Sequence, residues 1–134
     1  MVKKSNLKLG MIGERRFVVA ETHSIDFTDG MPPVLSTPWL LWFLEHAARD
    51  AVLSVLEPGE STVGVQVEID HLAATPLGHQ VTCRARIIQF DDKTVWFRLE
   101  AYDEHELIAR GFHKLRIVQV DRFSKRVHEK KKGQ

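Results

Sequence analysis

The sequence predicts an α+β fold in which a curled antiparallel sheet of about five strands wraps round one long central helix. Two observations predict this class. Residues 36–56 are the most apolar stretch of the chain and carry helix signals at both ends. After residue 60 the hydrophobic pattern changes to a period of two and keeps it almost to the end. The 134 residues suffice for one domain with a substantial core.

The central helix is predicted over residues 37–56. Pro38 disfavours the α region for the residue before it and suits the first helical position, so Thr37 is predicted as the N-cap. The run Glu57-Pro58-Gly59-Glu60 ends the helix. Its first two turns are apolar on nearly every side, which is typical of a helix buried all round.

The strands follow from shorter patterns. A first strand is predicted over residues 14–21, and residues 22–35 have turn chemistry without a period, so they form a loop long enough for a binding lid. Further strands are predicted over residues 61–72, 81–89, 95–101 and 107–120, and their short connections favour an antiparallel meander. In the first of these four, Val63, Val65, Val67 and Ile69 are predicted to share one face.

This arrangement is the hotdog architecture, and the alternative is another α+β sandwich with the helix on one face. Residues 1–13 are expected to form a flexible leader, 14–127 the folded domain and 128–134 a basic tail. We expect the chain from Arg122 onward to be solvated and mobile. A small sheet curled round one helix leaves open edges and apolar surface, which favours a homodimer.

Composition and charge exclude several classes of function. A net charge of +1 gives no reason to expect nucleic acid as a partner. The single cysteine, Cys83, excludes an internal disulfide framework and fits a reducing compartment. The sequence lacks an apolar run of the roughly 18 residues that a membrane span requires, and its first ten residues do not resemble a signal peptide. We therefore expect a cytoplasmic protein that binds neither nucleic acid nor membrane.

Seven histidines raise the question of a metal site. Glu45-His46 lacks the second histidine of a His-Glu-x-x-His motif, and no Cys-x-x-Cys or Gly-x-Ser-x-Gly motif is present. Histidines in predicted loops or in the tail are expected to be solvated; these are His23, His79, His105 and His128. His113 is within a strand and its face is left open, while Cys83 is expected to be inert on an apolar face. We expect neither a metal nor a cofactor.

Two polar residues are candidates for a chemical role. Glu45 follows the apolar turns of the helix, where burying an unpaired carboxylate costs roughly several kcal/mol. Arg49, four residues on, offers a structural explanation through a helical ion pair. His71 ends the strand after the helix, and a lone histidine there is most often structural. In a curled sheet, however, the end of that strand can approach a helix of the same or a partner subunit.

The spacing of Thr37, Glu45 and His71, with the run His71-Leu72-Ala73-Ala74-Thr75-Pro76, resembles the fluoroacetyl-CoA thioesterase family of hotdog enzymes. Glu-Pro-Gly-Glu after the helix and residues 122–127 are also similar, so the likeness covers roughly residues 14–127. The resemblance implies that the threonine, glutamate and histidine are catalytic. It also implies that Gly64, seven residues before the histidine, lies by the acyl group.

The chemistry of these residues fits thioester hydrolysis, which needs a base or nucleophile, a proton donor for the thiolate and donors for the oxyanion. Glu45 could attack the thioester carbon or activate a water. His71 could move the proton. Thr37 could orient the glutamate or the thioester, unless its hydroxyl caps the helix.

The resemblance also bears on the substrate. The fluoroacetyl-specific member has aromatic lid residues just before its catalytic threonine and an arginine on its last strand. Here the lid ends in Met31-Pro32-Pro33-Val34-Leu35, and the matching strand position is Leu115. We therefore expect a thioesterase for short- to medium-chain acyl-CoA, with Val34 and Leu35 contacting the substrate. A non-catalytic acyl-CoA-binding module and a hotdog enoyl-CoA hydratase or dehydratase are the alternatives.

Overall fold

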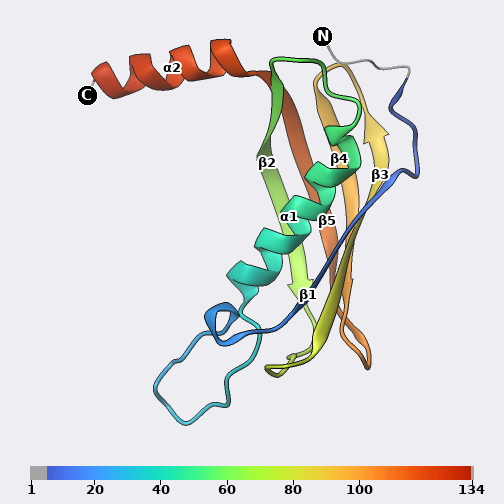
Figure 1. Ribbon diagram of the computed structural model, residues 1–134, viewed down its shortest axis with the longest axis vertical. Coiled ribbons are helices and arrows are strands. Elements are labelled where there is room, and N and C mark those ends of the chain that lie inside the picture. Colours follow the sequence, from blue (N-terminus) through green and yellow to red (C-terminus); the bar gives the residue numbers. More distant parts are fainter. Residues whose placement is uncertain (1–5, 134) are drawn as a thin grey trace.

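The computed structural model describes residues 6–133. Within them a five-stranded sheet curls round one long helix, and a second helix extends away from it (Figure 1). The elements are β1 (Ile12–Val18), the 3-10 helix η2 (Glu21–His23), α1 (Thr37–Leu53), β2 (Glu60–His71), β3 (Gln80–Phe90), β4 (Thr94–Tyr102), β5 (Leu107–Gln119) and α2 (Val120–Lys132). The predicted α+β class, with a curled antiparallel sheet round a central helix, is confirmed.

The strand order is β1-β3-β4-β5-β2, with antiparallel neighbours throughout. Strands β3, β4 and β5 form a meander as predicted, but β2 pairs with β5 and not with β3. That part of the prediction is wrong because residues 72–79 cross the open end of the sheet. There Leu35 N–H donates to the Thr75 carbonyl and Gly78 N–H donates to the Val19 carbonyl. These bonds carry the chain past the lid instead of turning it back on β2.

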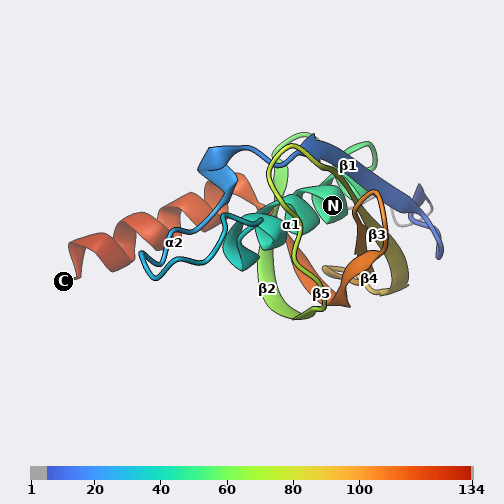
Figure 2. The same cartoon turned by 90° about the horizontal axis from the view of Figure 1, so that it is seen from below.

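The core lies between α1 and the concave face of the sheet, as the view from below shows (Figure 2). Helix α1 packs chiefly against β1 and β3 and touches β2 little. The buried helix residues are Leu40, Leu44, Ala47, Ala48, Ala51 and Val52. The sheet contributes the alternating residues predicted for it, which are Val81, Cys83, Ala85, Ile87, Val95, Phe97, Leu99 and Ala101. Gln89 leaves this series because the β3–β4 register shifts after Ile87.

Helix α1 differs from the prediction in two ways. It ends at Leu53 rather than at Leu56, with Ser54 as its C-cap. It is also not buried all round, because its side toward β2 is largely uncovered and Trp42 is 41% exposed there. The apolar first turns therefore supply both core residues and an exposed apolar surface.

Strand β2 contains a β-bulge at Val65. Gly64 pairs with Leu115 and Gln66 with Lys114, so one residue of β2 has no counterpart on β5. The extra residue resets the alternation, and Gly64 then shares the concave face with Val67. The predicted face Val63–Val65–Val67–Ile69 is wrong for its first two members, since period-two reasoning cannot register an inserted residue.

Helix α2 replaces the mobile tail expected from Arg122 onward. Its backbone begins where Val120 N–H donates to the Gly59 carbonyl, and its apolar residues Val120, Phe123 and Val127 recur at helical spacing on an exposed face. At the other end of the chain, β1 begins inside the predicted leader, whose first five residues lie outside the described part. Neither α1 nor α2 is long and apolar enough to cross a membrane.

Gly13 provides a test of how closely β1 approaches α1. A Cβ at this position would collide with the backbone carbonyl of Ala47 and lie 2.8 Å from the Ala51 nitrogen. Because backbone atoms cannot swing aside, we expect Gly13→Ala to lower the free energy of unfolding by about 2 kcal/mol or more in urea denaturation. Gly133→Ala is the matched control, since its nearest contact would be an ordinary 3.5 Å. Equal stability of the two variants would contradict this close approach.

Candidate active site

The start of α1 carries two hydroxyl residues with different tasks. Ser36 is the N-cap, and its Oγ accepts a hydrogen bond of 3.3 Å from Trp39 N–H. Thr37 is therefore the first helical residue and not the cap that the sequence predicted. The prediction failed because Ser36 and Thr37 are both good caps and only the backbone conformation separates them. Because Ser36 caps the helix, the Thr37 hydroxyl is available for other contacts.

The Thr37 hydroxyl bonds His71. Its Oγ1 lies 2.7 Å from His71 Nδ1, across from the helix start to the last residue of β2. The other ring nitrogen, Nε2, is buried without a hydrogen-bond partner among residues 6–133. Burial lowers the pKa of His71, against an opposing effect of the Ala73 carbonyl. The histidine is thus held in its neutral form, able to accept or pass on a proton at one end of the sheet.

Glu45 lines a separate cavity of about 140 Å³ between α1, β2 and β5. The cavity is bounded by Glu45, His46, Arg49, Thr62, Gly64, His113 and Leu115. The absence of a side chain at Gly64 makes room for the carboxylate, because a Cβ there would lie 2.8 Å from Glu45 Oε2. Among the ion pairs of residues 6–133 none joins Glu45 to Arg49, so the structural explanation offered by their spacing does not hold.

His113 is the site residue that sequence reasoning missed. It is 3% exposed, and its Nδ1–H donates to the Gln66 carbonyl at 2.9 Å. Burial lowers the pKa of His113, while the Gln66 carbonyl and the Glu45 charge oppose this effect. The available signal was the alternation along β5, where Ala109, His113, Leu115 and Ile117 all stand at odd positions and all are buried.

The structure brings together some of the predicted site residues and not others. Thr37 contacts His71, and Glu45 lies against Gly64, as described above. Glu45, however, follows Thr37 by eight residues, which is a rise of about 12 Å along an α-helix. Gly64 and His71 are likewise roughly 20 Å apart along β2. One chain therefore keeps two groups of predicted site residues apart. We call Thr37 with His71 the first half-site and Glu45 with Gly64 the second.

The predicted substrate contacts lie near the first half-site. Leu35 is fully buried in the core, and Val34 is half-buried and bridges to Pro76. Beyond them the lid of residues 22–35 exposes Phe27 and Met31. His23 is not solvated as expected, because it packs edge-on against Phe17, Trp39 and Phe43.

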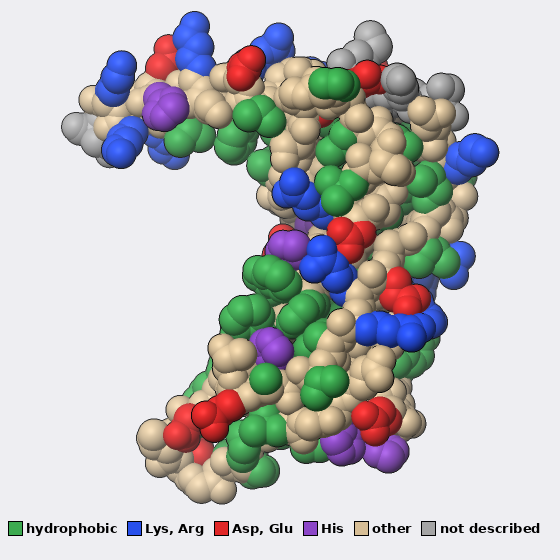
Figure 3. Space-filling view, in the orientation of Figure 1, with side chains coloured by type: hydrophobic (Ala, Val, Ile, Leu, Met, Phe, Trp, Pro, Cys, Tyr) green, Lys and Arg blue, Asp and Glu red, His purple; other side chains and the backbone are tan. Residues whose placement is uncertain are grey.

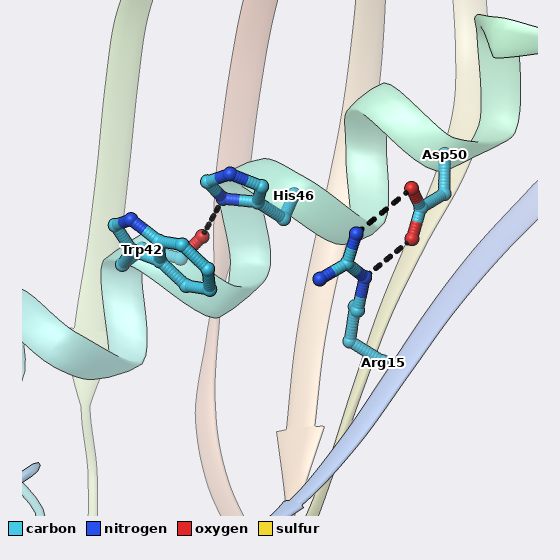
Figure 4. A network of polar contacts seen from close by, with 4 residues as sticks. All are labelled: Arg15, Trp42, His46 and Asp50. Carbon is cyan, nitrogen blue, oxygen red and sulfur yellow. Dashed lines mark hydrogen bonds and ion pairs between the residues drawn. The ribbon is translucent and has the colours of Figure 1, made fainter.

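The outer surface of α1 is held by polar contacts (Figure 4). Arg15 of β1 forms a two-pronged ion pair with Asp50, at 2.6 and 3.2 Å. One turn earlier, His46 Nδ1–H donates to the Trp42 carbonyl at 2.7 Å, and the two rings stack. The Arg15–Asp50 pair fixes the helix against β1. The contacts of His46 with Trp42 orient one wall of the Glu45 cavity.

Other chemistries find little support in residues 6–133. No group of three or more His, Cys, Asp or Glu residues there is arranged to hold a metal ion. Burial raises the pKa of Cys83 to about 12, so its thiol stays protonated and unreactive at neutral pH.

Comparison with known proteins places this geometry in a class. The structure superposes on a thioesterase superfamily member from Thermus thermophilus with a TM-score of 0.85 at 28% identity, covering 95% of this chain and 97% of that one. It superposes on a fluoroacetyl-CoA-specific thioesterase with a TM-score of 0.87 at 26% identity, covering 93% and 98%. The fold is thus that of hotdog thioesterases.

The sequence narrows this class to one family. Residues 19–121 match the family described as fluoroacetyl-CoA-specific thioesterase. The fluoroacetyl-CoA thioesterase of Streptantibioticus cattleyicolor is 30% identical over 99 residues, which is 74% of this chain and 71% of that protein. The chain belongs to the fluoroacetyl-CoA-specific thioesterase family, a family of thioester hydrolases, as the sequence resemblance implied.

Buried His113 and half-buried His71 predict how stability depends on pH. The pKa values of His71 and His113 lie below their ordinary 6.5, so the unfolded chain binds more protons as the pH falls through that value. We expect the free energy of unfolding to be lower at about pH 5.5 than at about pH 7.5. His113→Phe should flatten this dependence in urea titrations, whereas His128→Phe on exposed α2 should leave it unchanged. A wild-type stability that rises on acidification would contradict the analysis.

Proposed function

We propose that this protein is an acyl-CoA thioesterase that hydrolyses short- to medium-chain acyl-CoA to the free acid and CoA. The observation that carries the proposal is the Glu45 carboxylate, placed in a cavity against Gly64 in a member of a thioesterase family. A related thioesterase has been solved as a variant in complex with fluoroacetate and CoA, which supports an acyl-CoA substrate here.

The residues divide the reaction between them. Glu45 acts on the thioester carbon, either directly or through a water. His71, neutral and hydrogen-bonded to Thr37, supplies or removes protons as the C–S bond breaks and the thiolate leaves. At the start of α1, Pro38 has no N–H and the Trp39 N–H bonds Ser36 Oγ, which leaves the Thr37 N–H for the developing oxyanion. The reaction needs no metal or cofactor.

The substrate is an ordinary acyl group rather than a fluorinated one. Leu115 lines the cavity where the fluoroacetyl-specific enzyme has an arginine on its last strand. The lid residue Val34 is aliphatic and half-buried, which suits an alkyl chain, whereas Leu35 is buried in the core and supports the lid from beneath.

We propose that the working form is a homodimer in which two chains complete each site. Strand β2 is an edge strand, and antiparallel pairing of two β2 edges about a two-fold axis between Val67 and Glu68 would set Gly64 opposite His71 of the second copy. Glu45 of one copy would then face Thr37 and His71 of the other. This arrangement joins the half-sites, which one chain keeps about 12 Å apart along α1.

Two further surfaces support the same dimer. In the space-filling view the molecule is hollowed beside β2, with α2 at one end of the hollow and the lid at the other (Figure 3). Helix α2 carries six basic and two acidic side chains beside the exposed Phe123 and Val127. The lid carries Asp26 and Asp29 beside the exposed Phe27, and has no lysine or arginine. A two-fold axis brings each basic, apolar helix toward the acidic, apolar lid of the other copy.

We also propose a cytoplasmic location, since a single buried thiol suits a reducing compartment. The folded part begins with β1 at Ile12, two residues before the predicted domain start at residue 14, and we propose no nucleic-acid or membrane partner.

Release of free thiol from a panel of acyl-CoA thioesters, acetyl to dodecanoyl, tests the activity. We expect release that is fastest for one short or medium chain and that falls at least ~100-fold in Glu45→Gln, the usual contribution of a general acid–base group. Glu106→Gln, in the exposed turn before β5, is the control and should match wild type. Binding of acyl-CoA without thiol release would establish the non-catalytic module instead, and loss of the enoyl absorbance of crotonyl-CoA would indicate a hydratase.

Mixing two inactive variants tests the shared site. If Glu45 serves the partner's His71, a heterodimer of Glu45→Gln and His71→Ala chains contains one intact and one doubly defective site. Random exchange of subunits should therefore restore about one quarter of wild-type activity. If each chain held a complete site, every site in the mixture would stay defective and no activity would return. Co-expression with two different tags, followed by thiol-release assays on the mixed species, makes the measurement.

A further inference from the structure

The proposed reaction leaves one buried titratable group without a task. His113 lies on the concave face of β5, in the same cavity as Glu45, and its ring stacks on Phe97. A purely structural histidine in this position could be replaced by a larger apolar residue, as Phe97 and Leu99 show on the neighbouring strand. An imidazole at the wall of a cavity beside a carboxylate is instead an arrangement suited to handling a proton or a water.

The contacts of His113 show which nitrogen is left for chemistry. Nδ1 is occupied by its bond to the Gln66 carbonyl, and because a carbonyl only accepts, Nδ1 must carry the hydrogen. In the neutral ring Nε2 is then an acceptor with a free lone pair. The Gln66 carbonyl follows directly after the bulge at Val65, so the bulge of β2 sets the orientation of the imidazole.

Gly64 determines the spacing between the imidazole and the carboxylate. A Cβ on this glycine would lie 2.8 Å from Glu45 Oε2 and 3.2 Å from His113 Cε1, so those two atoms are at most about 6 Å apart. Nε2 is the ring neighbour of Cε1, so the space that a side chain would fill at Gly64 is bordered by the carboxylate on one side and by the imidazole on the other. One water can bond both groups where Oε2 and Nε2 lie within about 6 Å of each other, since each hydrogen bond spans about 2.8 Å.

We propose that His113 is a further catalytic residue, which with Glu45 holds the water that attacks the thioester. The inference rests on the proposed thioesterase activity and decides between the two roles open to Glu45. One hydrogen of the water bonds to the Glu45 carboxylate and the other to His113 Nε2, which leaves an oxygen lone pair directed at the thioester carbon. Glu45 takes the first proton as the C–O bond forms. The tetrahedral intermediate then breaks its C–S bond, and that proton passes by way of His71 to the thiolate to give the free acid and CoA.

Two substitutions separate this role from a structural one. The amide nitrogen of asparagine can replace Nδ1 and keep the bond to Gln66, while leaving nothing at the position of Nε2. The amide of glutamine reaches the position of Nε2 and gives up the bond to Gln66. If His113 Nε2 holds the water, His113→Asn should lower kcat about 100-fold with KM little changed. His113→Gln should then recover at least ~10-fold of this loss. A structural role predicts the opposite order.

The measurement is kcat and KM for thiol release, with urea denaturation to confirm that both variants are folded. Wild-type-like kcat in His113→Asn would overturn the inference and leave the thioesterase assignment intact. Absence of thiol release from wild type would overturn the assignment and this inference with it. If His113→Asn is unstable, the result rests on His113→Gln, which must then retain more activity than His113→Phe; equal activity of these two would also overturn the role at Nε2.

Discussion

The close approach of β1 to α1 is the constraint on which the remaining structure depends. Gly13 allows the strand to meet the helix backbone at Ala47 and Ala51, where any side chain would collide. Small residues on both sides let the helix lie deep against β1 and β3, and the Arg15–Asp50 pair secures the contact at its edge. A helix drawn to one side of a curled sheet must leave the opposite side, β2, uncovered. The position of the cavity follows from this asymmetry.

The same asymmetry explains where polar chemistry is tolerated. Glu45 and His113 face each other across the gap between α1 and the β5–β2 side of the sheet, where the core packing of Leu40 and Leu44 does not reach. A carboxylate in the closely packed β1 side would have no room and no partner. Glu45 and His113 therefore lie at the side of the core that packing leaves open, and the bond to the Gln66 carbonyl orients His113 there.

Much of the fold could be predicted because its signals are local. Pro38 at the helix start, the Glu-Pro-Gly-Glu stop and the alternation along β3 and β4 each report on a few neighbouring residues. What escaped prediction depends on partners distant in sequence. The pairing of β2 with β5 and the bulge at Val65 are decided by contacts that no local pattern contains. The cap at Ser36 is a local contact, and it was missed because the adjacent Thr37 is an equally good cap.

The candidate site, like the fold, could be predicted only in part. Thr37, Glu45 and His71 could be named from spacing and family resemblance, and the Thr37–His71 contact was found. Their separation into two half-sites could not be named, because it requires the rise along α1 and the length of β2 in three dimensions. His113 was left open although its alternation with Leu115 and Ile117 indicated a buried face; its place beside Glu45 depends on the pairing of β5 with β2, which the sequence does not contain.

The bulge at Val65 has a consequence for how the sequence can vary. It divides β2 into two segments whose side-chain phases are independent, one ending at Gly64 and the other leading to His71. A one-residue insertion or deletion in an ordinary strand turns every following side chain to the other face. In β2 such a change can be absorbed by widening or removing the bulge, so the segment at Gly64 and the segment at His71 are free to change length separately. Strand β2 therefore consists of two segments, each with its own side-chain register.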